Sequence, residues 1–95
     1  MPQDPFAEAA KSFSVSQALL IEFLSTDLDL AFTFLDLAQM YIQSDPDHFR
    51  GLMQKARRVL ETVRKFEERI QDPRARQATR ERGDSLEAAM AAAQS

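Results

Sequence analysis

The stretch Leu28–Ile42 reads LDLAFTFLDLAQMYI, and it decides the fold class of this chain. Eleven of its fifteen residues are apolar, counting alanine and tyrosine. They cover almost the whole circumference of a helix, whereas a helix on a protein surface carries one apolar stripe. Asp29, Thr33 and Asp36 interrupt them along a single line. The stretch therefore needs neighbours on most of its sides, supplied by the rest of the chain or by another copy.

The segment that follows begins with the strongest helix-start signal in the chain. Asp45 suits the N-cap position and Pro46 the first helical position. A long helix predicted from Pro46 to Gln71 carries apolar residues at alternating spacings of three and four: Phe49, Leu52, Ala56, Val59, Val63, Phe66 and Ile70. The same spacing relates Leu28, Ala31, Leu35, Ala38 and Ile42. Two such seams joined by a short turn predict an antiparallel helical hairpin of about 27–43 and 46–71.

A further helix is predicted before the hairpin, over about 15–24. Ser14 and Gln17 have the spacing of a capping box, which is typical of a helix start. The segment 25–27 favours a break, because Thr26 could cap a second helix; one continuous helix over 15–43 is the alternative. The predicted fold is therefore all-α: a small helical bundle, with this N-terminal helix packed on the hairpin or continuous with it.

The two ends of the chain carry weaker signals. Pro2 and Pro5 predict a tail or a short helical turn over residues 1–12. Asp72 and Pro73 repeat the cap-plus-proline signal and should end the long helix. The expected organisation is an N-terminal tail (1–12), a helical bundle (13–71), and an arginine-rich segment followed by an alanine-rich helix or tail (72–95).

Composition narrows the class of protein. The chain has 95 residues and no cysteine, so disulfides and thiolate metal sites are excluded. Its N-terminal residues do not resemble a signal peptide, and Leu28–Ile42 would span about 22 Å as a helix, which is too short for a bilayer. We therefore expect a cytoplasmic protein without membrane contact.

Charge is divided between the two halves of the chain. Residues 1–47 contain eight acids and one base, whereas residues 48–95 contain eleven bases and seven acids. This asymmetry predicts that the halves pair with each other or with another copy, or that one half binds nucleic acid. A candidate partner-binding basic face lies on the long helix and consists of Arg50, Arg57, Arg58, Arg64 and Lys65. The alternative for this face is a solvated helix surface, and the acidic pI of about 5.1 weighs against nucleic acid.

No catalytic pattern is found in the sequence. His48 is the sole histidine and falls in the first turn of its helix. A histidine phosphotransfer motif has a basic residue and a glycine three and four positions after the histidine, but Arg50 and Gly51 come two and three positions after it. We therefore predict no enzyme activity, cofactor, metal or small-molecule ligand.

The surplus of apolar surface suggests the function. The seam of the long helix covers one side of Leu28–Ile42, which leaves a candidate oligomer contact of Leu30, Phe34, Leu37 and Met40. The sequence therefore predicts a small intracellular interaction or oligomerisation module whose partner is itself, as a homo-oligomer, or another helical protein. A nucleic-acid-associated protein that uses the basic face is the alternative.

Overall fold

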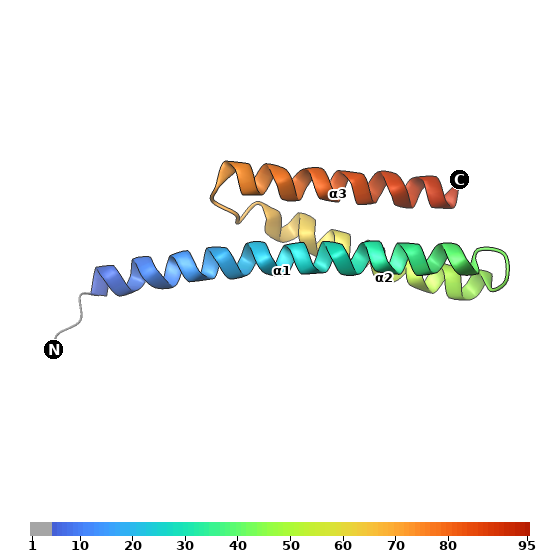
Figure 1. Ribbon diagram of the computed structural model, residues 1–95, viewed down its shortest axis with the longest axis horizontal. Helices are drawn as coiled ribbons and strands as arrows, with labels where there is room; N and C mark the ends of the chain where they lie inside the picture. Colours follow the sequence, from blue (N-terminus) through green and yellow to red (C-terminus); the bar gives the residue numbers. More distant parts are fainter. Residues whose placement is uncertain (1–4) are drawn as a thin grey trace.

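A computed structural model describes residues 5–95 of the chain, with side chains from Ser16 onward. It contains three helices, α1 (Pro5–Tyr41), α2 (Pro46–Glu67) and α3 (Pro73–Gln94). Figure 1 shows that α2 runs back along α1 and that α3 then runs parallel to α1, so that the C-terminus lies near the α1–α2 turn. The predicted all-α bundle and its antiparallel hairpin are confirmed.

The region before the hairpin is not a separate helix, because α1 continues without interruption from Pro5 to Tyr41. The favoured break at 25–27 and the helix start at Ser14 are therefore wrong, and the continuous alternative is correct. Leu24 explains this, since it lies four residues before Leu28 and is fully buried with it. A break would interrupt this seam. Of the predicted tail over 1–12, the first four residues lie outside the described residues, and the rest is helical.

The hairpin core is built from the two predicted seams. On α1 these are Leu28, Ala31, Leu35 and Ala38; on α2 they are Leu52, Ala56 and Val63, with Met53 and Leu60 added beside them. The alanines let the two backbones approach closely, because a methyl group occupies little of the space between helices. Ile42 differs from its prediction: it lies in the turn after α1, and its side chain is 44% exposed.

The predicted cap between α1 and α2 is confirmed. The Asp45 side chain accepts a hydrogen bond from His48 N at 3.1 Å, and Pro46 occupies the start of the helix. The Asp45 backbone N–H also donates to Tyr41 O at 2.9 Å, which closes the turn. These bonds satisfy backbone groups that a helix end leaves without an internal partner.

The turn between α2 and α3 begins earlier than predicted, because α2 ends at Glu67 instead of Gln71. Gln17 of α1 holds this turn through both ends of its side chain. Its Nε2 donates to Arg69 O at 3.1 Å, and its Oε1 accepts from Gln71 N at 2.9 Å. Ile70 is fully buried between these two residues. The α2–α3 turn is thereby tied to α1, and Gln17 has this role in place of the predicted capping box.

The arginine-rich segment and the alanine-rich segment form one helix, α3. The Asp72 carboxylate caps it by accepting from Ala75 N at 3.2 Å. Its buried face consists of small residues in the first half and large ones in the second: Thr79, Gly83, Leu86 and Met90. Their spacing of four, three and four is that of a helix face. This face packs against both α1 and α2.

Gly51 offers a test of the local structure of α2. A Cβ atom added to this glycine would meet nothing within 4 Å, so a close approach between helices does not explain the residue. Alanine is favoured over glycine inside a helix by about 0.5–1 kcal/mol. We therefore expect Gly51→Ala to raise the free energy of unfolding by about that amount, measured by urea denaturation. A loss of stability would show that Gly51 has a contact absent from this fold.

Candidate interaction surface

The most prominent surface feature is a line of exposed apolar side chains on α1, which we call the outer stripe. It consists of Leu19, Phe23, Leu30, Leu37 and Met40, whose exposed fractions range from 40% to 72%. At 100° per residue, the stripe lies roughly 160° around α1 from the buried seam of Leu24, Leu28 and Leu35. Neither α2 nor α3 covers it, because both pack on the other faces of α1.

The structure places the predicted oligomer contacts on or beside this stripe. Leu30, Leu37 and Met40 are exposed, whereas Phe34 lies at the edge and is partly buried. Lys55 of α2 holds its Nζ 5.8 Å from the centroid of the Phe34 ring. The sequence prediction missed Leu19 and Phe23, which it assigned to a helix that could cover the other four. The signal was present, since Phe23, Leu30 and Leu37 are spaced by exact intervals of seven residues.

The edge of the stripe that lies away from Phe34 is acidic. Glu22, Asp29 and Asp36 recur every seven residues along it, and the described side chains of α1 include no lysine or arginine. Arg82 of α3 pairs with Asp29 at 2.5 Å and donates to Ser25 Oγ at 3.2 Å. This pair joins the acidic and basic halves of the chain within one molecule, which is one of the outcomes that the charge asymmetry predicted.

The predicted basic face does not form a single surface. Arg64 is turned toward α3, where its Nη2 lies 2.6 Å from Asp84 Oδ1 and 3.3 Å from Glu87 Oε2. Arg50 pairs with Asp47 at the start of α2. Arg58 and Lys65 are exposed to solvent, and Lys65 Nζ lies 5.8 Å from the Phe66 ring. The five cations therefore divide between the α2–α3 interface and the open side of α2.

Arg64 belongs to an ion network that joins α2 and α3. The Glu67 side chain, 8% exposed, lies 3.5 Å from Arg64 Nη1 and 3.7 Å from Arg80 Nε, and its Oε2 receives no hydrogen bond. Burial by itself would lower the pKa of Arg64, but the hydrogen bond to Asp84 and the charges of Glu67 and Asp84 outweigh it and raise that pKa. A Cβ atom at Gly83 would lie 2.9 Å from Arg64 Nη1, so this glycine makes room for the guanidinium group.

We expect Arg64→Ala to lower the free energy of unfolding by about 2 kcal/mol, because hydrogen bonds to charged groups contribute about 1.5–3 kcal/mol and Glu67 would lose one of its two cations. Arg57→Ala is the matched control, one heptad earlier on the same helix, and should change stability by less than about 0.5 kcal/mol. Urea denaturation of the two variants compares them directly. Equal losses would contradict the structural role of the Arg64 network.

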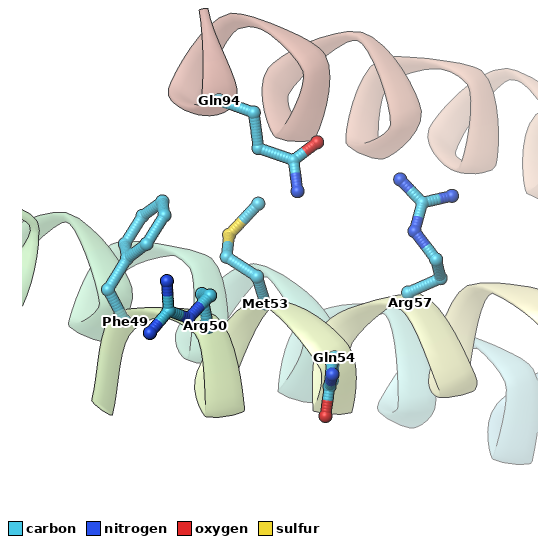
Figure 2. Close-up of a pocket in the computed structure, with 6 residues that line it drawn as sticks. All are labelled: Phe49, Arg50, Met53, Gln54, Arg57 and Gln94. Atoms are coloured by element: carbon cyan, nitrogen blue, oxygen red, sulfur yellow. The ribbon is translucent and has the colours of Figure 1, made fainter. Parts of the chain in front are cut away.

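A hollow lies between α2 and the C-terminal end of α3. Figure 2 shows Arg57 and Gln94 pointing into the gap above Met53, with Phe49 and Arg50 at one side. Its volume is about 210 Å³, and a neighbouring hollow of about 420 Å³ shares Phe49, Arg50 and Gln94 with it. Arg50 is already paired with Asp47. One remaining guanidinium and one amide above an apolar floor do not select a particular ligand.

Metal sites and membrane-spanning helices would point to other functional classes. From Ser16 to Ser95, no three histidine, aspartate or glutamate side chains come together as a possible metal site. Over residues 5–95, no helix combines the length and apolar character needed to cross a membrane. Comparisons of the chain with protein-family models, with curated proteins and with solved structures found nothing that matches it.

Proposed function

We propose that this chain is a small helical interaction module that self-associates through the outer stripe and has no catalytic role. The observation that carries the proposal is the exposure of five large apolar side chains along one line of α1. Single exposed apolar residues are ordinary on protein surfaces, but several large ones gathered on one face are typical of a contact site. Covering this line would remove apolar surface from water, which is the main favourable term in protein association.

The shape of α1 supports the same proposal. Figure 1 shows that its N-terminal turns project beyond the α2–α3 turn, and the molecule is 65 Å long but 24 Å and 15 Å across. Helices in proteins owe most of their stability to packing against a neighbour. A second chain that lies along the stripe could extend beside this projecting part of α1.

The alternative, a nucleic-acid-associated protein, has less support from the arrangement of charges. Binding to phosphates needs several cations on one accessible surface. Arg64 and Arg82 are paired with carboxylates of the same chain, and Arg50 is paired with Asp47. Retention of the protein on immobilised DNA or RNA at about 0.1 M salt, lost on charge reversal of Arg58 and Lys65, would favour this alternative over self-association.

Solution mass tests the proposed function. Self-association predicts a mass that rises with protein concentration and reaches twice the chain mass of 10.8 kDa. Multi-angle light scattering over about a hundredfold range of concentration measures this. A mass that stays at the monomer value throughout would contradict the proposal.

A further inference from the structure

The outer stripe has the sequence period of a coiled coil. Together with the two threonines between its members it runs Leu19, Phe23, Thr26, Leu30, Thr33, Leu37 and Met40, at spacings of four and three in strict alternation. This is the a/d pattern of helices that pack side by side at a small angle. The pattern is separate from the buried seam that binds α2. The outer stripe is therefore a second seam on α1, of the kind that packs against another helix.

The two edges of this seam differ in charge. Glu22, Asp29 and Asp36 each immediately precede Phe23, Leu30 and Leu37, which places them at the g positions of the heptad. The e positions on the other edge are Leu20, Asp27, Phe34 and Tyr41. Two basic residues of the α1–α2 hairpin lie beside that edge. Lys55 Nζ is 5.8 Å from the Phe34 ring, and the His48 ring contacts Tyr41 edge-on with centroids 4.3 Å apart.

This difference distinguishes the two ways in which a second copy could pack. In an antiparallel pair, g positions face g positions. Glu22 would then lie across from Asp36 of the second copy, and Asp29, which Arg82 of its own chain already neutralises, across from Asp29. Two of the three contacts along this edge would therefore bring like charges together. Like charges at such positions are unfavourable.

In a parallel pair, g positions face the e positions of the other helix, five residues further along. Asp29 would then lie across from Phe34 of the second copy, next to Lys55, and Asp36 across from Tyr41, next to His48. Glu22 would face Asp27, which is the one like-charge pair of this arrangement. At two of the three g positions, the parallel arrangement therefore places Lys55 or His48 where the antiparallel one places a carboxylate.

We propose that the occupant of the outer stripe is a second copy of this chain, packed parallel and in register so that each stripe residue meets its own counterpart across a two-fold axis. The inference rests on the proposed self-association and adds its direction. The acidic edge of each α1 lies against the Lys55 edge of the other. The interface is isologous and closed, so the assembly stops at two chains.

Cysteine cross-linking can test the direction, because the chain has no cysteine of its own. In the parallel pair Thr26 meets Thr26, so two Thr26→Cys chains hold their thiols face to face. Oxidised glutathione then accepts two electrons from the thiols, and a disulfide joins the chains. In an antiparallel pair the d positions face the a positions, so Thr26 meets Leu30, and a mixture of Thr26→Cys and Leu30→Cys proteins would join instead. Arg58→Cys, on the open side of α2, measures cross-linking by random collision.

We expect Thr26→Cys to form covalent dimers at least about tenfold faster than Arg58→Cys at equal concentration, because the paired thiols have a high effective concentration. The mixture of Thr26→Cys and Leu30→Cys should give few mixed dimers. A dimeric wild-type protein whose Thr26→Cys form links no faster than Arg58→Cys would overturn the parallel arrangement, as would efficient mixed linking. A monomeric wild-type protein would overturn the proposed function itself, so light scattering keeps the two failures apart.

Discussion

Replacing Leu28 by alanine is expected to lower the free energy of unfolding by about 2–5 kcal/mol. Leu28 is 1% exposed and packs in the centre of the seam that joins α1 to α2. Removal of its side chain loses buried apolar surface and leaves a cavity that the surrounding leucines fill incompletely. Urea denaturation followed by circular dichroism gives the free energy of unfolding of the variant and the wild type.

Leu30→Ala is the control for this prediction. Leu30 has the same side chain and lies two residues away on the same helix, but it is 44% exposed and points away from α2. At concentrations where the protein is monomeric, we expect this change to cost less than about 1 kcal/mol. The difference between the two variants measures the distinction between the buried seam and the outer stripe. Equal losses would contradict that distinction.

The double variant Leu30→Asp, Leu37→Asp is expected to abolish self-association and leave the fold intact. In the dimer, each chain would bury two unpaired carboxylates at the centre of the interface, and an uncompensated buried charge costs about 3 kcal/mol or more. Each 1.4 kcal/mol changes a dissociation constant tenfold, so the dissociation constant should rise more than about a thousandfold. In the monomer both carboxylates face water, and the helix content seen by circular dichroism should be retained.

A matched control separates the position of the new charges from their number. Gln54→Asp with Ala88→Asp adds the same two charges on exposed positions of α2 and α3, away from the stripe. This variant should dimerise as the wild type does. If both double variants lose the dimer equally, net charge and not the outer stripe controls association.

The hairpin could be predicted because its signals are local and strong. The sequence at Ser44–Asp47 combines an N-cap, a proline and an acidic first turn. The structure ends α1 at Tyr41, shortly before this segment, and begins α2 at Pro46 within it. The α1 seam alternates large and small apolar residues and is buried from Leu28 to Ala38. On α2, Leu52, Ala56 and Val63 are buried as predicted, whereas Phe49, Val59 and Phe66 are only partly buried. Such local rules need no knowledge of the rest of the fold.

The rest of α1 was harder to predict, because Ser25-Thr26-Asp27 has the composition of a helix start but lies within a helix. Packing decides between the two outcomes. Leu24 and Leu28 on either side of the segment belong to one buried seam, and tertiary packing outweighs the weak local preference of serine and threonine. The predicted break at 25–27 also separated Leu19 and Phe23 from Leu30 and Leu37, so the full length of the outer stripe could not be predicted.

The position of α3 and the separation of the five basic residues both depend on contacts between residues that are far apart in the sequence. The buried face of α3 begins with Thr79 and Gly83. Neither is a large apolar residue, so the sequence shows no apolar heptad pattern along this face. Its docking depends partly on Arg64 and Glu67 of α2, and on the pair of Arg82 with Asp29. The spacing along α2 shows that Arg57 and Arg64 lie on the same side of the helix. It does not show that Arg64 pairs with carboxylates of α3.

The measurement that tests the central claim most directly is the solution mass of the wild type and the Leu30→Asp, Leu37→Asp variant at the same concentrations. We predict that the wild type approaches twice 10.8 kDa as concentration rises, and that the variant stays at 10.8 kDa with its helix content unchanged. A wild type that remains monomeric, or a folded variant that dimerises as well as the wild type, would contradict the claim that the outer stripe is the surface through which this protein associates.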